Sequence, residues 1–114
     1  MKLSEAIRKG NELVPNQTVG RYFQIDGHTL KCACAMGMAY IGQNPDVLKT
    51  EKLELTDLTN IISDTFEYTK VIIEPTCNVC HSACASIKGL VVHLNDTHFL
   101  SPAAIASDLE ERGF

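Results

Sequence analysis

The sequence predicts a small single domain of the α+β class, mainly helical, with about five helices, a short β hairpin or strands, and a zinc-finger-like C-terminal half. Three observations support this prediction. Apolar residues recur at three- and four-residue steps in several segments, an Asp-Gly pair follows strand-favouring residues, and most cysteines and histidines come after residue 76. The length of 114 residues fits one domain. We expect a helical part over residues 1–70 and the zinc-finger-like part with a terminal helix over residues 71–114.

The first expected helix lies near the N-terminus. Ser4 is suited to cap it, and Pro15 would end it. Its apolar residues fall close to one stripe, namely Leu3, Ala6, Ile7 and Val14.

A strand and a tight turn are expected next. Tyr22, Phe23 and Ile25 are residue types that favour strands. Asp26-Gly27 is a typical tight-turn pair, so we expect His28 in an exposed loop.

Residues 30–42 are expected to form a second helix. Their apolar members recur at helical steps, at Leu30, Ala33, Cys34, Met38 and Ile41. The small residues of this segment would let another helix approach closely. On such a helix Cys32 and Cys34 do not share a face, so we expect Cys34 in the core and Cys32 near the surface.

The rest of the chain predicts three more helices. One runs through residues 55–68, and a short strand or extended segment over residues 71–75 follows it. The next covers residues 86–96 and has a clean apolar stripe of Ile87, Leu90, Val91 and Leu94. The last begins at Ser101-Pro102, a capping serine with proline in the first turn, and ends at Gly113.

Charge and cysteine content restrict the class of protein. The net charge is −4 with no basic block, which argues against strong non-specific binding to nucleic acid. No apolar run approaches the roughly 20 residues that span a bilayer, and the N-terminus lacks the apolar core of a signal peptide. We therefore expect a cytoplasmic protein without membrane contact. Five cysteines, an odd number, do not suit a disulfide framework in such a chain.

The segment CNVCHSACASIKGLVVHLNDTH contains the candidate metal ligands. Two residues separate Cys77 from Cys80, twelve separate Cys80 from His93, and four separate His93 from His98. This spacing is typical of zinc sites with two cysteines and two histidines, in which a turn presents both thiolates and a following helix supplies both imidazoles. The sequence predicts one structural zinc ion at these four residues.

The same segment resembles the Cys2His2 zinc finger. That family has a leucine three positions before its first histidine, and Leu90 occupies the position here. Its aromatic residue, four positions after the second cysteine, is replaced by Cys84. The departure weakens the small core of an isolated finger, so we expect this site to depend on the rest of the domain.

Other uses of these residues stay open. His81, Cys84, Cys32 or Cys34 could supply a different fourth zinc ligand, or the cysteines could be buried or spare in a metal-free protein. Cys77-Asn-Val-Cys80-His81 also matches the attachment motif of a c-type haem, with His81 as axial ligand, although attachment normally occurs outside the cytosol. A redox dithiol is a weaker alternative, because the motif does not open a helix in a strand–helix–strand unit.

The ends of the chain resemble a group of small bacterial and phage-encoded proteins for which no activity is established. The shared features are LSEAIRKG, a Cys-Ala-x-Gly stretch beginning at Cys34, and VVHLNDTH followed by a terminal helix with IASDLE. A cysteine pair often precedes the HLND segment in that group, and an aromatic residue, often tryptophan, follows its second histidine, where this chain has Phe99-Leu100. The resemblance is discontinuous, covers about half of the chain, and implies the layout but no activity.

These observations predict a zinc-stabilised protein-interaction or regulatory module without catalysis. Four protein ligands would leave the metal no open position for substrate, and no phosphate-binding or Ser-His-Asp motif is present. Asn95 and Asp96 could orient His98, or could belong to a solvated helix end.

A nucleic-acid-binding zinc-finger protein is the alternative function. By alignment with a finger, base-reading positions fall at Ser86, Gly89 and Val92, with Lys88 beside them, and arginine is absent there. We expect the acidic residues of the last helix, Asp108, Glu110 and Glu111, to face outward and repel phosphates. Any binding to duplex DNA is therefore predicted to be weak.

Overall fold

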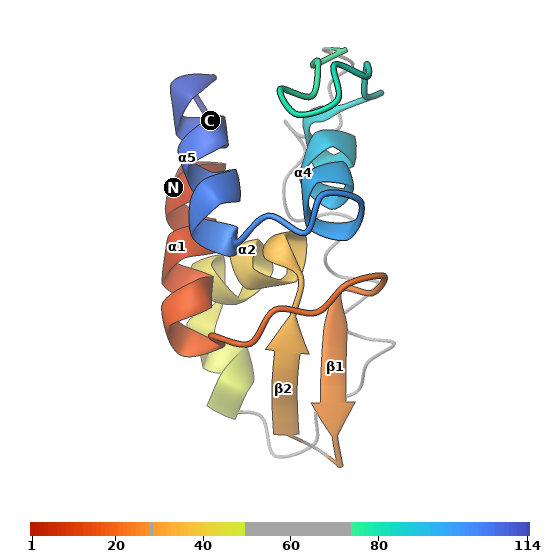
Figure 1. Cartoon of the computed structure of the whole chain (residues 1–114). Coiled ribbons are helices and arrows are strands. Elements are labelled where there is room, and N and C mark those ends of the chain that lie inside the picture. Colours follow the sequence, from red (N-terminus) through yellow and green to blue (C-terminus); the bar gives the residue numbers. More distant parts are fainter. Residues whose placement is uncertain (28, 50–73) are drawn as a thin grey trace.

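A computed structural model describes residues 1–27, 29–49 and 74–114. Within these ranges the chain forms four α-helices, a 3₁₀ helix and a two-stranded antiparallel sheet (Figure 1). In chain order they are α1 (Leu3–Leu13), β1 (Phe23–Asp26), β2 (Thr29–Ala33), α2 (Ala35–Gln43), the 3₁₀ helix η1 (Pro45–Lys49), α4 (Ile87–Asp96) and α5 (Pro102–Glu111). The α+β class is confirmed, but the described residues hold four α-helices where about five were expected. The helix predicted over residues 55–68, His28, and the start of the segment over 71–75 lie outside the described residues.

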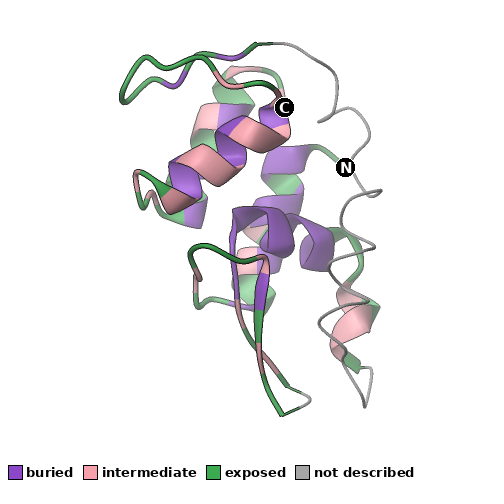
Figure 2. Ribbon diagram, turned by 90° about the vertical axis from the view of Figure 1, so that its right-hand side faces the viewer, coloured by how far each residue is buried: buried purple, intermediate pink, exposed green. Residues whose placement is uncertain are grey.

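The centre of the fold is the contact between α1 and α2. Every residue of α2 from Ala35 to Gly42 is buried, and Figure 2 shows this helix in the colour of buried residues near the centre of the molecule. The two helices touch through backbone, because a Cβ atom on Gly10 would overlap the Met38 carbonyl and one on Gly42 would overlap the Ala6 carbonyl. The close approach expected from the small residues of this segment is therefore present.

The start of the second helix differs from the prediction. Residues 29–33 form strand β2, which pairs antiparallel with β1, and the helix begins only at Ala35. The backbone at this junction is bonded to other segments, since the Ala33 N–H donates to Asn16 O and the Cys34 N–H donates to Tyr22 O. The local residue pattern fits a helix as well as a strand, and these long-range backbone bonds decide in favour of the strand.

The N-terminal helix also starts differently. Lys2, not Ser4, is the N-cap residue, and its side chain makes no capping bond. Ser4 lies inside the first turn, and its N–H donates to the carbonyl of Phe114 at 3.0 Å. The C-terminal residue thus supplies the acceptor that a capping side chain would otherwise provide.

The C-terminal helices follow the sequence closely. The predicted stripe of α4 is buried, and the Ser86 hydroxyl accepts the Gly89 N–H at its start. Ser101 caps α5 by accepting the Ala104 N–H. At the end of α5, Gly113 has a positive φ of 91°, and the Phe114 N–H donates to Leu109 O, which is the bond pattern of a Schellman motif. Helix α5 lies beside α1, with α4 on its other side (Figure 1).

Candidate metal centre

The four residues that the spacing predicted as zinc ligands come together in the structure. The ligand atoms of Cys77, Cys80, His93 and His98 all lie within 4.8 Å of one another. The Cys80 sulfur is 3.3 Å from Nε2 of His93, and the two histidine Nε2 atoms are 3.0 Å apart. Ligand atoms around a tetrahedral zinc ion, with bonds of about 2.0–2.3 Å, are roughly 3.3–3.8 Å apart. The group could hold one metal ion, and its two sulfurs and two imidazoles fit zinc.

A short backbone loop presents the two cysteines. Thr76 and Ala83 form an antiparallel bridge, and the Cys77 N–H donates to Ser82 O. The His81 N–H donates to Cys77 O at 2.9 Å, with His81 itself at a positive φ of 63°. This tight reversal turns both thiols toward the same point, and it leaves Cys77 fully buried while Cys80 is exposed.

The histidines come from the end of α4. His93 lies in the last turn of that helix, and His98 follows two residues after it ends. The Leu100 N–H donates to Leu94 O at 3.1 Å, and Phe99 has a positive φ of 54°. This bond spans six positions, one more than the long bond of a Schellman motif, and it closes the helix end with Phe99 in the left-handed region that glycine usually occupies. The reversal brings the His98 ring to the His93 ring, with centroids 4.7 Å apart.

The environment of Cys80 favours its thiolate form. Hydrogen bonds from the Ser82 hydroxyl and the Ser82 N–H, and then from His93 and His98, lower the pKa of the Cys80 thiol to about 5. The Ser82 oxygen is 3.2 Å from the sulfur. A thiolate at neutral pH is the form that binds metal, so this cysteine is prepared for ligation.

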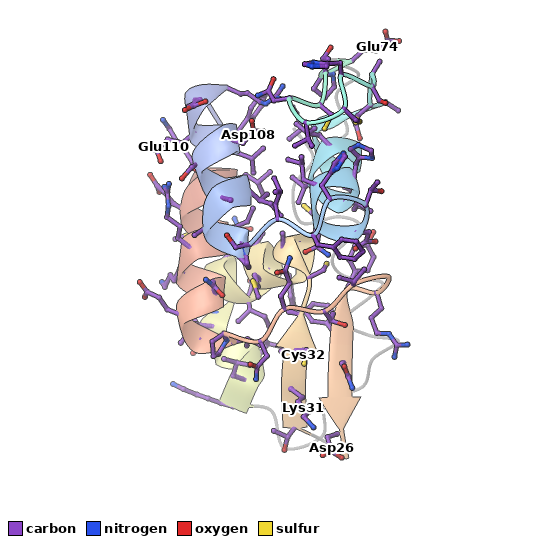
Figure 3. All side chains as sticks on the ribbon, in the orientation of Figure 1. Asp26, Lys31, Cys32, Glu74, Asp108 and Glu110 are labelled. Atoms are coloured by element: carbon purple, nitrogen blue, oxygen red, sulfur yellow. The ribbon has the colours of Figure 1, made fainter. Side chains whose placement is uncertain are left out.

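The other candidate ligands lie outside this group. His81 is exposed and is not a member of the cluster. Cys84 is partly buried near the site, and burial, together with the charges of the two ligand thiolates, raises the pKa of its thiol. Cys32 lies on β2, at the far end of the molecule from the cysteine loop (Figure 3).

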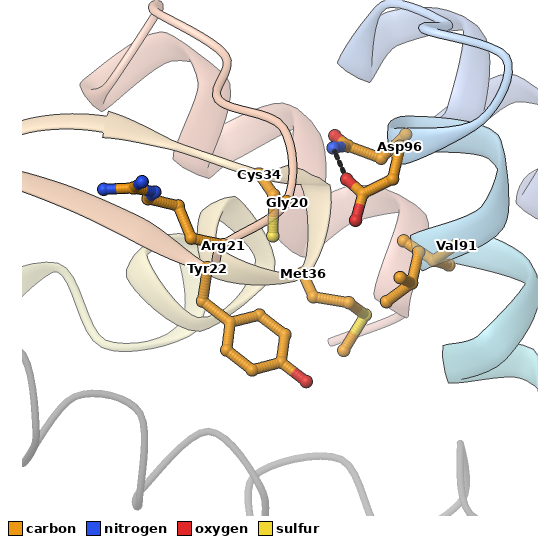
Figure 4. Close-up of a pocket in the computed structure, with 9 residues that line it drawn as sticks. Gly20, Arg21, Tyr22, Cys34, Met36, Val91 and Asp96 are labelled. Carbon is orange, nitrogen blue, oxygen red and sulfur yellow. Dashed lines mark hydrogen bonds between the residues drawn. The ribbon is translucent and has the colours of Figure 1, made fainter.

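Cys34 belongs to the core, as expected, but it is not a helix-interior residue. It is the N-cap of α2, and its sulfur accepts the Gly37 N–H at 3.4 Å. Burial raises the pKa of its thiol to about 11. The residue lines a pocket of about 250 Å³ between the segment before β1 and α4, together with Met36 and Val91 (Figure 4). Because its thiol is protonated at neutral pH and enclosed by other side chains, we assign Cys34 a packing role.

Asn95 and Asp96 do not orient His98, and Asn95 is not part of a solvated helix end. The Asn95 side chain is 1% exposed, and its Oδ1 accepts from the Ala35 N–H at 3.0 Å and from Gln17 Nε2 at 2.8 Å. Its Nδ2 donates to Thr18 O and to the Asp96 carboxylate. Asn95 therefore joins the metal-site helix to the N-terminal half. The sequence held a signal for this, because positions 87, 91 and 95 continue one stripe at four-residue steps.

The face predicted to read DNA has other contacts. Ser86 caps α4, Val92 is partly buried, and the Lys88 ammonium lies 5.3 Å from the centre of the Tyr22 ring, a cation–π distance. Among the acidic residues of α5, Glu110 and Glu111 are exposed as expected. Asp108 is not turned outward, since it contacts the cysteine loop through Asn78.

Comparison with family models, with curated proteins and with solved structures finds no match for this chain. The resemblance to the bacterial and phage-encoded group therefore gains no support from a matching family. The resemblance to a zinc finger is supported only at the level of the ligand group, which could bind a metal. None of the helices in the described ranges is long and apolar enough to cross a membrane.

Proposed function

We propose that this chain is a small zinc-stabilised protein-interaction or regulatory module, with one structural zinc ion held by Cys77, Cys80, His93 and His98. The observation that carries the proposal is the convergence of four ligand atoms within 4.8 Å. Four protein ligands complete a tetrahedron, so the ion has no open position for a substrate or an activated water. The metal therefore serves folding rather than catalysis, and the chain is not an enzyme.

A protein partner is favoured by the side chains around the metal centre. Phe99 is 68% exposed and directly follows one ligand, and Val79 is 51% exposed and directly precedes another. Aromatic residues such as an exposed phenylalanine are enriched in protein interfaces relative to the rest of the surface. The net charge of −4 and the engagement of Lys88 with Tyr22 argue against nucleic acid as the main partner. The proposed location of this module is the cytoplasm.

Metal content is the first test. Protein purified without chelator should contain one zinc ion per chain by elemental analysis, and Cys80→Ser should reduce it. A Cys84→Ser variant is the matched control, because this neighbouring cysteine is outside the ligand group and should leave zinc content unchanged. Protein with no bound transition metal would refute the proposal, and a haem absorption band would replace it with the haem alternative.

The choice of partner class needs a second test. Titration with random and genomic duplexes at physiological salt should give micromolar or weaker affinity, as expected for mainly non-specific contacts. Nanomolar, sequence-dependent binding would overturn the interaction module and establish the nucleic-acid alternative. In parallel, proteins captured by the wild-type chain should be lost with Phe99→Ser and retained with Val19→Ser, an exposed apolar residue far along the chain from the site.

A further inference from the structure

Two side chains of α5 contact the loop that carries both cysteines. The Asp108 carboxylate pairs with the Arg112 guanidinium, with Nε and Oδ2 2.9 Å apart. The other carboxylate oxygen accepts from Asn78 Nδ2 at 2.8 Å, and Arg112 Nη2 donates to Thr76 O at 2.7 Å. The Asp108–Arg112 pair therefore bonds at the same time to Thr76, immediately before Cys77, and to Asn78, immediately after it.

This ion pair is sheltered from solvent. The side chains of Asp108 and Arg112 are 15% and 21% exposed. The other ion pair of the same helix, Arg8–Glu110, has side chains that are 41% and 58% exposed. Figure 3 shows Asp108 toward the cysteine loop and Glu110 on the opposite side of α5. Because a partly buried charge pair is less screened by water and salt, the Asp108–Arg112 pair can hold a fixed geometry that a surface pair does not.

The cysteine loop has little apolar packing to define its shape. A Cys2His2 finger has an aromatic residue at the position of Cys84, and this chain lacks it. At the tip of the loop, Val79 and Cys80 are exposed, whereas Cys77 is fully buried. Hydrogen bonds must then supply the order that packing gives elsewhere. Apart from the contacts of Cys80 with the two ligand histidines, the bonds to α5 are the ones by which the loop is tied to another described element.

We propose that Asp108 and Arg112 are positioning residues of the metal centre. Through Asn78 and Thr76 they hold the cysteine loop in the shape in which the Cys77 and Cys80 thiolates face the two histidines. This inference rests on the proposed zinc site and adds the residues that set its affinity. It also explains how a finger-like segment works without its usual aromatic residue, because the last helix takes over the support of the loop.

The test compares zinc affinity and zinc release in three variants. Asp108→Asn places an amide against Arg112, Arg112→Lys keeps the charge but cannot reach both Asp108 and Thr76, and Glu110→Gln is the control on the same helix. Affinity is measured by competition with a chromophoric chelator, and release is followed with excess chelator well below the melting temperature. We expect about tenfold weaker binding and faster release for Asp108→Asn, at the lower end of losses for supporting residues of metal sites. Arg112→Lys should show a smaller loss, and Glu110→Gln none.

Cobalt substitution separates positioning from ligation. The Asp108→Asn protein should still give the absorption of a tetrahedral cobalt site with two thiolates, whereas Cys80→Ser should lose much of the thiolate charge-transfer band. Wild-type affinity and release in both Asp108→Asn and Arg112→Lys would overturn the inference, even if their melting temperatures fall. If Asp108→Asn does not fold, Arg112→Lys decides alone. Absence of metal from the wild-type chain would instead refute the zinc site itself.

Discussion

Replacing Asn95 with alanine tests how the metal-site helix is joined to the N-terminal half. The Asn95 amide is 1% exposed and makes four hydrogen bonds. One partner is the Ala35 N–H, which is buried at the first residue of α2. In the alanine variant this buried N–H loses its acceptor.

The expected loss of stability can be worked from these contacts. An unsatisfied buried donor costs about 1–3 kcal/mol, and each of the three remaining bonds contributes about 0.5–1 kcal/mol, so the sum is roughly 2.5–6 kcal/mol. This is a large part of the 5–15 kcal/mol that stabilises a typical domain. With an unfolding entropy of about 2.1 cal/mol/K per residue, a chain of 114 residues loses about 4 °C of melting temperature per kcal/mol, or roughly 12 °C for a loss of 3 kcal/mol.

Urea denaturation of the zinc-loaded protein, followed by circular dichroism, gives the free energy of unfolding directly. Asn44→Ala is the matched control, because Asn44 is exposed and its side chain makes a single bond to a described residue, with Tyr40 O at 3.2 Å. That variant should stay within about 0.5 kcal/mol of wild type. If Asn95→Ala lost no more than Asn44→Ala, the buried network would not join the two halves, and the reasoning would be wrong.

Three further predictions concern the cysteines and the strained turn. Cys77→Ser should lower zinc content and melting temperature far more than Cys32→Ser, since thiolate ligation contributes to folding; equal thermal shifts would count against the assignment. Phe99→Gly should raise the free energy of unfolding by about 1 kcal/mol, because glycine adopts the positive φ of 54° without steric cost; a decrease would mean that the exposed ring contributes packing. In zinc-free protein, Cys80 has a pKa lowered to about 5 and stays a thiolate until the pH falls through that value, so its alkylation by iodoacetamide should be nearly constant above about pH 6. Cys34, with a pKa raised to about 11, should remain unmodified at pH 8, and comparable labelling of both residues by mass spectrometry would contradict these environments.

Patterns confined to one segment could be predicted from the sequence. The stripe of α4, the Ser101-Pro102 start of α5 and the turn at Asp26-Gly27 all depend on residues within a few positions of one another. The ligand group belongs to the same class, because a tight turn and one helix end fix the spacing of its four members. These features follow from local backbone geometry and short-range hydrogen bonds, which the order of residues specifies directly.

Contacts between distant segments were decided by the tertiary structure. Residues 30–33 have a helical pattern but belong to strand β2, since β1 and the segment before it offer backbone partners at that place. Asp108 was expected to face solvent and instead supports a loop 30 residues earlier in the chain. Asn95 bonds to Ala35, 60 residues away. The sequence by itself determined where the four α-helices of the described residues lie, to within a few residues, and which four side chains could share a metal. The tertiary structure decided which contacts hold these elements in place, because the local sequence around a polar side chain does not specify the distant partner that it needs once it is buried.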